Sequence, residues 1–177
     1  MPKRPGHCYS KLEARPYVKK KSKKKKEYVR GVPDNKIQVF DMGSKTEDFP
    51  VYVNLVTKET GQIRHFALEA ARITANRVLE KKAESKDNYH LKIRVYPHHV
   101  LRENKMMAFA GADRLQDGMR RAFGKPIGTA ARVKAGQELV TIGVNPQFVE
   151  LAKLALKRAA MKLPLPCYTT VVNRPAA

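Results

Sequence analysis

Residues 105–134 combine basic side chains with glycines at short intervals, in the order KMMAFAGADRLQDGMRRAFGKPIGTAARVK. Arginine presents a planar fork of donors that matches phosphate oxygens, and glycine lets a backbone approach another polymer closely. A loop of this length inside a compact domain is usually functional or disordered. We interpret it as a surface that contacts RNA, with a flexible surface excursion as the alternative. Its expected RNA contacts are Lys105, Arg114, Arg120, Arg121, Lys125 and Arg132.

Two other patterns in the chain are weak signals for chemistry. His98 and His99 are adjacent, so in an extended chain they point to opposite sides and do not converge on one metal ion. We expect both to contact RNA or to pack. The pair Gly124-Lys125 resembles the end of a phosphate-binding loop, but position 119 is Met and position 126 is Pro, where that motif needs Gly and Ser or Thr.

The two cysteines, Cys8 and Cys167, lie near opposite ends of the chain, without the paired spacing of a zinc site. Two cysteines are also too few for a disulfide scaffold, so we expect reduced thiols in a cytosolic protein. No acid, base and nucleophile converge in the sequence. We therefore expect a protein without enzymatic activity, metal or cofactor.

The charge of the chain indicates a polyanionic partner. Lys and Arg number 36 against 16 Asp and Glu, which makes the formal net charge +20. Nucleic acid is favoured because each neutralised phosphate releases a condensed counterion. A membrane is disfavoured because the chain has no Trp and no apolar run of the roughly 18 residues that a spanning helix needs. The first residues also lack the apolar stretch of a signal peptide.

Half of this charge lies in residues 1–30, which hold 12 basic residues and two acids. Such a block repels itself and buries nothing, so we expect residues 1–32 to form an extended tail that binds RNA. A localisation signal and a solubilising tail are the alternatives. Tyr9, Tyr17 and Tyr28 are expected to stack on unpaired bases or to pack on the domain. The expected contacts are Lys3, Arg4, Arg15, Lys19, Lys20, Lys21, Lys23, Lys24, Lys25, Lys26 and Arg30.

Residues 33–174 have the composition of one globular domain. Alternation of apolar residues predicts strands over 36–40, 51–57, 91–95, 129–133, 139–144 and 167–172, with a tight turn at 134–137. A three-and-four spacing predicts a helix over 63–82, and Asn145-Pro146 predicts the start of another, ending near residue 163. This order predicts an α+β fold in which two amphipathic helices pack on one mixed, mostly antiparallel sheet.

The apolar face of the first helix is predicted to contain Ile63, Phe66, Ala67, Ala70, Ile73, Thr74 and Val78. Its other side carries Arg72 and further polar residues, which we expect to face solvent or RNA.

Several segments together resemble one family, the large-subunit ribosomal proteins called L ten-e in archaea and eukaryotes and L sixteen in bacteria. They are RGVPDNKIQVFDMG (30–43), ALEAARITANR (67–77), VYPHHVLRENKMM (95–107), GADRLQDGMRRAFGKPIGTAARV (111–133) and the Lys162-Leu163-Pro164 end of the last helix. The segments cover most of the chain, and the one at 111–133 is the most specific. The long lysine run and the short C-terminus resemble an archaeal member.

The resemblance implies a hammerhead-like strand arrangement and a place on large-subunit rRNA. It implies that the loop at about 102–128 points toward the acceptor arms of tRNA near the peptidyl transferase centre. The RNA contacts that it implies are Arg114, Arg120, Arg121 and Lys125 in the loop, with His98, His99 and Arg102 at its base. It also implies a monomer within the cytoplasmic ribosome, next to other ribosomal proteins, that supports translation and subunit assembly. The rival hypothesis is a non-ribosomal basic chaperone of nucleic acids or a chromatin-like binder.

Overall fold

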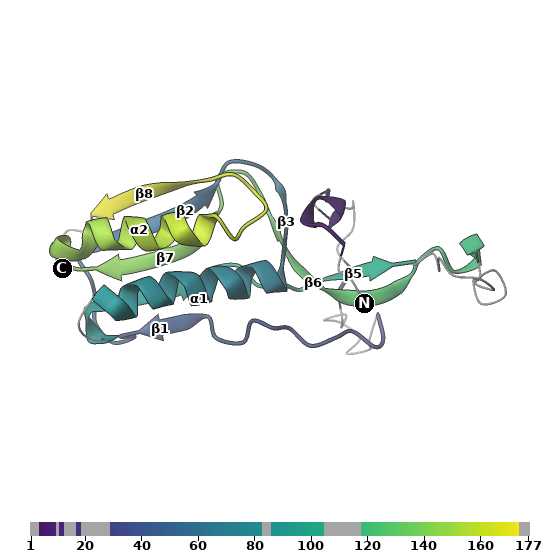
Figure 1. The fold of residues 1–177 in the computed structure, drawn as a ribbon, viewed down its shortest axis with the longest axis horizontal. Coiled ribbons are helices and arrows are strands. Elements are labelled where there is room, and N and C mark those ends of the chain that lie inside the picture. The colour runs from purple at the N-terminus through teal and green to yellow at the C-terminus, as the bar shows by residue number, and fades with distance from the viewer. Residues whose placement is uncertain are drawn as a thin grey trace.

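Two α-helices and two antiparallel sheets make up the regular structure of the described residues (Figure 1). The computed structural model describes residues 4–9, 11–12, 17–18, 29–82, 86–104 and 118–173. The helices are α1 (His65–Lys82) and α2 (Val149–Ala160). The strands are β1 (Asp41–Gly43), β2 (Val51–Thr57), β3 (Gly61–Arg64), β4 (Tyr89–Ile93), β5 (His99–Glu103), β6 (Lys125–Val133), β7 (Glu138–Val144) and β8 (Cys167–Asn173).

The larger sheet has the order β1-β4-β7-β2-β8, and both helices lie side by side over one of its faces (Figure 1). Its alternating apolar residues are in register across the strands. Val53 lies opposite Ile142, which lies opposite Leu91, and all three are fully buried. The main hydrophobic core therefore fills the layer between this sheet and the helices.

Alanines line the contact between the two helices and the core. Ala71 and Ala75 of α1 are buried, as are Ala152 and Ala155 of α2, and the helices pack against each other. Small side chains let helix backbones approach closely, while the larger Leu68 and other aliphatic residues fill the space toward the sheet.

The smaller sheet, with the order β3-β6-β5, extends away from the body (Figure 1). Ala130 in the middle of β6 pairs with Arg64 of β3 on one side and His99 of β5 on the other. Nearer its start, β6 pairs with β5 alone among the described strands. We call residues 99–104 and 118–132 the arm, because they form the projecting ribbon and its described 3-10 turn (Gly118–Arg121).

The α+β class and the presence of two helices agree with the sequence prediction, but three details differ. The protein has two sheets in place of one, and all described strand pairs are antiparallel, so no mixed sheet forms. The tight turn at 134–137 does exist, with the Gln137 amide donating to the Lys134 carbonyl at 3.1 Å. It joins β6 of the arm sheet to β7 of the body sheet, so these neighbouring strands do not pair with each other.

The predicted strand at 36–40 is wrong, because the residues that pair are Asp41–Gly43, directly after it. Residues 36–40 are still held against the body, since Ile37 is buried and the Phe40 carbonyl accepts the Ile93 amide at 2.8 Å. Extended chain that packs without a partner strand carries the same alternating pattern as a strand.

The predicted first helix begins two residues too early, and its predicted apolar face is only partly right. Ile63 belongs to β3, and Ile73 is 50% exposed. The buried apolar positions of α1 are Leu68, Ala71, Ala75, Val78 and Leu79, of which only Val78 was predicted. Alanines are only weakly hydrophobic, so the pattern was dominated by the larger Phe66 and Ile73, which do not lie on the buried face.

The second helix is also shorter than predicted. Asn145 precedes a 3-10 turn (Pro146–Phe148), and its side chain makes no capping hydrogen bond. The α-helix proper starts at Val149, and turns continue to Leu163, whose amide donates to the Ala160 carbonyl. The strands predicted at 51–57, 139–144 and 167–172 match β2, β7 and β8 within one residue, whereas the strand predicted at 91–95 is β4, two residues earlier.

Candidate nucleic-acid interface

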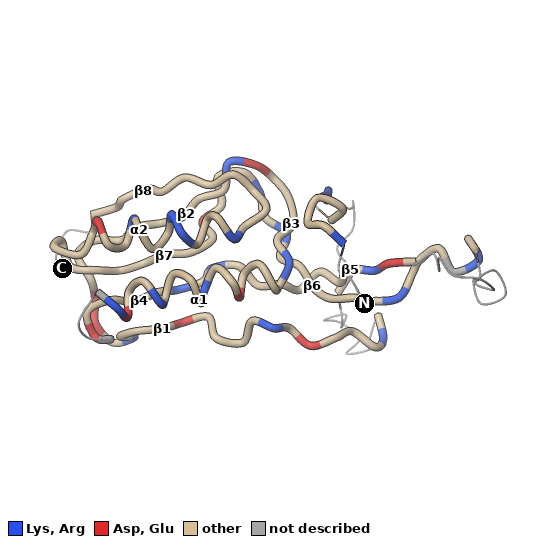
Figure 2. Tube along the Cα trace, viewed as in Figure 1, with Lys and Arg blue, Asp and Glu red and all other residues tan. Residues whose placement is uncertain are grey.

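The arm concentrates positive charge on backbone that projects from the body. It contains five basic residues and one acid, which leaves +4 (5 minus 1). Figure 2 shows these basic residues at intervals along the arm out to its far end. The basic residues are Arg102, Arg120, Arg121, Lys125 and Arg132, and the acid is Glu103.

The single acid of the arm is already neutralised within the protein. Glu103 accepts a charged hydrogen bond from the Arg4 guanidinium and another from the Tyr9 hydroxyl at 3.3 Å. This hydrogen bond to Glu103 raises the pKa of Arg4, while burial is the main cause that raises the pKa of Tyr9. Arg64 completes the cluster by donating to the Arg4 carbonyl at 2.9 Å. The potential of the arm is therefore set by its basic residues.

Arg102, which we expected to contact RNA, packs against two aromatic rings at the base of the arm. Its guanidinium carbon lies 4.0 Å from the ring centre of Tyr17 and 4.1 Å from that of Phe123. These two rings meet edge to face, with centres 5.4 Å apart. A guanidinium over an aromatic face contributes about 0.5–2 kcal/mol, depending on its desolvation. The cluster joins Tyr17, β5 and the chain just before β6 into one unit.

His99, also expected to contact RNA, is 1% exposed. Its Nδ1 accepts the Tyr17 backbone amide at 3.0 Å, and Val18 bridges to it as an isolated antiparallel pair. His99 is therefore too deeply buried to contact RNA, and its predicted role is wrong. His98 faces solvent, in agreement with the opposite orientation that we predicted for the pair.

A glycine shapes the point at which the arm's outer turn returns to β6. Gly124 has φ +76°, and a Cβ there would lie 2.6 Å from the Glu103 carbonyl carbon and 2.8 Å from the Asn104 nitrogen. Only glycine fits such a left-handed, crowded position. Asn104 closes the turn by donating to the Gly118 carbonyl at 3.1 Å. The Gly118–Arg121 turn is thereby held at the far end of the described arm.

The outer surface of the arm offers both charge and apolar area. Arg120 and Lys125 are exposed, Met119 is 81% exposed, and Phe123 is half-exposed. Basic groups can bind phosphate oxygens, while an exposed thioether or ring can lie against a base or a sugar. Such a combination suits folded RNA better than it suits a small anion.

Other predicted contacts lie on the body. Arg30 is exposed, whereas Arg132 is half-buried in β6, opposite Gln62. Arg72 already donates two hydrogen bonds to Glu69, at 2.7 and 3.0 Å, and this pairing raises its pKa. An RNA phosphate at Arg72 would have to share or displace the Glu69 carboxylate.

Many expected contacts lie outside the described residues: Lys3, Arg15, Lys19, Lys20, Lys21, Lys23, Lys24, Lys25, Lys26, Lys105 and Arg114. Arg121 is described only in its backbone. The N-terminal segment also contacts β3, since the Gln62 side chain donates to the Lys11 carbonyl. Val29 is buried, so packed chain begins before the domain boundary that we predicted at residue 33.

Sequence reasoning missed the residues that build the arm. Glu103, Asn104 and Phe123 fell inside a segment interpreted as a loop, although its ends form β5 and the start of β6. For Tyr17 the sequence left two roles open, stacking on an unpaired base or packing on the domain. In the structure its ring packs against Arg102 of the domain. The apolar pair Val100-Leu101 beside His99 was the available signal for a strand.

Within the part of the chain that the structure describes, no group of three or more His, Cys, Asp or Glu side chains is placed to hold a metal ion. Cys8 is exposed and Cys167 is partly buried, and neither forms a disulfide. Burial raises the pKa of the Cys167 thiol, which disfavours its nucleophilic form. None of the described helices has the length and apolar character to cross a bilayer.

Comparison with known proteins matches nearly the whole chain. A family model described as ribosomal protein L16p/L10e matches residues 16–170. The large ribosomal subunit protein uL16 of Staphylothermus marinus is 58% identical over 166 residues, which cover 94% of this chain and 91% of that protein. The protein of the same name from Methanoculleus marisnigri is 51% identical over 177 residues, 100% of both chains. That from Archaeoglobus fulgidus is 50% identical over 166 residues, 94% of this chain and 91% of that protein.

Proposed function

Since this chain belongs to the ribosomal protein L16p/L10e family, we propose that it binds large-subunit rRNA through its body and N-terminal residues and presents the arm to tRNA. Family membership makes the protein a structural, non-enzymatic constituent of the large subunit in the cytoplasmic ribosome, with the archaeal uL16 proteins as relatives. The proposal concerns the contacts that the protein makes there.

The distribution of charge on the arm carries this proposal. The arm holds five basic residues, and its one acid is paired with Arg4. Arg120 and Lys125 are exposed at the outer part of the ribbon, beyond the last pairing with β3. A cationic surface on a projecting element can reach a second polyanion while the body stays bound to the first.

The body and the tail are proposed to serve the other contact. The basic N-terminal residues bind rRNA together with the body, which leaves the arm for tRNA. The lysines of residues 19–26 can neutralise phosphates without recognising a particular sequence, which suits contact with an rRNA backbone. Contact with neighbouring ribosomal proteins belongs to the same proposal.

The test rebuilds large subunits that lack this protein. Subunits receive the wild-type chain or the Arg120→Glu/Arg121→Glu variant, and we measure retention after a high-salt wash and the affinity for tRNA. We expect equal retention and at least tenfold weaker tRNA binding for the variant, because phosphate contacts become repulsive. The body variant Lys45→Glu/Lys81→Glu, at two exposed lysines, changes the charge by the same amount and should leave tRNA affinity within about twofold.

Two outcomes separate this proposal from the rival, a free basic chaperone of nucleic acids. The ribosomal role predicts that the chain co-sediments with the large subunit after the wash. Spread over bulk DNA and free RNA would support the chaperone. Equal loss of retention and of tRNA binding in the arm variant would place the arm on rRNA instead of tRNA.

A further inference from the structure

The two edge strands of the five-stranded sheet, β1 and β8, differ in length and in charge. β1 has three residues, and its Asp41 is paired with His90 at 3.3 Å and Lys92 at 3.7 Å. β8 has seven residues, CYTTVVN, with no charge and no proline. Its pairs run from Val51 with Asn173 to Thr57 with Cys167, all on the β2 side. No described strand pairs with its other edge.

Natural sheets usually protect an edge with charge, proline or brevity. β1 shows two of these protections, and β8 shows none of the three. Val171 and Val172 are 44% and 46% exposed, although β-branched apolar residues are suited to a paired, covered strand. The backbone donors and acceptors along such an edge are a template for a further strand.

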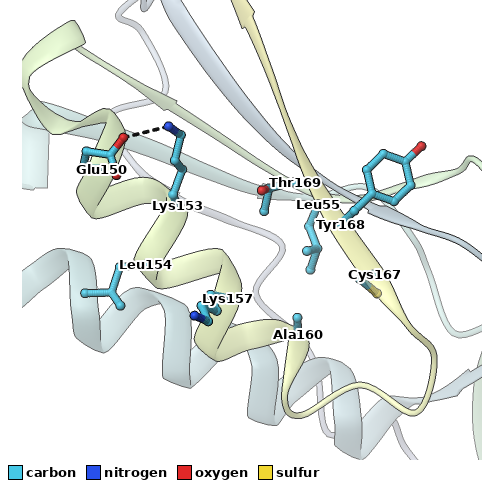
Figure 3. A pocket seen from close by; sticks show the side chains of 9 residues that line it. All are labelled: Leu55, Glu150, Lys153, Leu154, Lys157, Ala160, Cys167, Tyr168 and Thr169. Atoms are coloured by element: carbon cyan, nitrogen blue, oxygen red, sulfur yellow. Dashed lines mark hydrogen bonds and ion pairs between the residues drawn. The ribbon is translucent and has the colours of Figure 1, made fainter.

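A groove follows this edge on the side of α2 (Figure 3). It has a volume of about 400 Å³, and Leu55 of β2 lies at its floor. Thr169 faces the helix across the groove, whereas Tyr168 points to the opposite side of the sheet (Figure 3). Alternate side chains of a strand added beside β8 would therefore enter the groove, as the pleat requires.

The wall of the groove opposite β8 is positively charged. Lys153 and Lys157 come from α2, and Lys153 is paired with Glu150 at 2.7 Å. Lys157 is exposed and makes no ion pair among the described residues. A side chain that enters the groove beside Lys157 would gain most if it were a carboxylate.

We propose that the free edge of β8 and the groove beside α2 bind an extended segment of a neighbouring protein, which adds as a sixth strand and places an acidic side chain against Lys157. Nucleic acid suits this edge poorly. In a chain of formal charge +20, residues 167–173 carry no Lys or Arg, and a strand edge pairs with a peptide backbone and not with phosphates.

The experiment places a photo-crosslinking residue, benzoylphenylalanine, at Val171 of the full chain and irradiates purified large subunits that contain it. Incorporation is measured on the same gradient, so a failure to assemble is distinguished from a failure to crosslink. The same residue at Ile73, which is 50% exposed on α1, is the control for general exposure. Each adduct is treated with ribonuclease or protease, and its peptide is sequenced.

We expect a protein adduct from Val171 that Ile73 does not give, with an acidic residue in the crosslinked peptide or next to it. Lys157→Glu should lower its yield roughly fivefold, as expected when an exposed ion pair becomes repulsive. Arg158→Glu makes the same charge change in the same helical turn, outside the groove, and should leave the yield unchanged. An adduct with RNA, an adduct with a second copy of this chain, or no adduct in fully assembled subunits would overturn the proposal.

Discussion

The backbone amide of Tyr17 donates to Nδ1 of His99 at 3.0 Å, across a sequence separation of 82 residues. The Val100 amide in turn donates to the Tyr17 carbonyl at 2.7 Å. Tyr17 and Val18 thus form an isolated bridge with the start of β5. These two residues are in this way part of the base of the arm.

Removal of the His99 acceptor should release this segment. In His99→Leu the Tyr17 amide loses its partner at a buried site, which costs about 1–3 kcal/mol. Amide exchange at Tyr17 should accelerate and the free energy of unfolding should fall. The matched control is His98→Leu, one residue away and exposed, which should change neither quantity by more than about 0.5 kcal/mol. Unchanged exchange at Tyr17 in His99→Leu would contradict the role that we assign to this ring.

Two glycines with nearly equal φ separate the effect of backbone strain from that of crowding. Gly136 has φ +77° with nothing within 4 Å of an added Cβ, and Gly124 has φ +76° with backbone atoms at 2.6 and 2.8 Å. Gly136→Ala should cost about 1–2 kcal/mol from strain alone. Gly124→Ala should cost more, because the backbone at Glu103 must also move.

This difference should be visible in amide exchange along β5. We expect Gly124→Ala to lose protection at Glu103 and Asn104, while Gly136→Ala keeps it. Equal protection in the two variants would show that the arm adapts to a side chain at position 124 without disturbing β5.

Loss of the Tyr89 proton should make the protein less stable at alkaline pH. Its ring is 1% exposed, its hydroxyl donates to Asn76 Oδ1 at 2.9 Å, and burial raises its pKa above the ordinary value of 10.0. The folded chain then holds this proton more tightly than the unfolded chain does. Its stabilising effect is complete below pH 10 and is lost as the pH rises from there through the folded pKa.

Tyr89→Phe tests this by removing the ionisable group. The variant should be about 1 kcal/mol less stable at neutral pH, because the hydrogen bond to Asn76 is lost. Urea unfolding at intervals from pH 8 to 11 should show the wild type falling more steeply, so that the two curves approach each other. Parallel curves would mean that Tyr89 does not contribute to the alkaline loss.

The lysine run should contribute to rRNA affinity through charge alone. Replacement of the seven lysines in residues 19–26 by glutamine should weaken binding to any rRNA fragment and reduce the slope of log K against log salt by roughly 6, if each contacts one phosphate. Replacement by arginine keeps the charge and should keep the slope. An effect confined to one rRNA sequence would argue for a specific contact instead.

Alternation of apolar residues was sufficient to find the strands that lie between two neighbours, as for β2 and β7. It failed for β5, a strand of the exposed arm. β5 is paired to β6 and to Tyr17, and neither pairing leaves a mark on the sequence of residues 99–103 beyond two apolar residues. The charged and glycine-rich context indicated a loop because such residues are typical of loops, and they are equally tolerated on an exposed two-stranded ribbon.

The candidate site was only partly predictable for a related reason. Residue type shows which side chains can bind phosphate, and it identified the exposed Arg120 and Lys125 as possible contacts. It does not show which cations already have a partner in the fold. Arg72 on Glu69 and Arg102 on Tyr17 are occupied by contacts that only the tertiary structure brings together.

β6 has a mechanical consequence for the ribosome. It runs unbroken for nine residues, roughly 30 Å, and its Ala130 is clamped between two strands while its outer half is bonded to one. Bending under a load at the tip should therefore concentrate just outside that clamp, near Gly128. If tRNA binds the arm as we propose, it would displace the outer ribbon while the sheet behind it keeps its position.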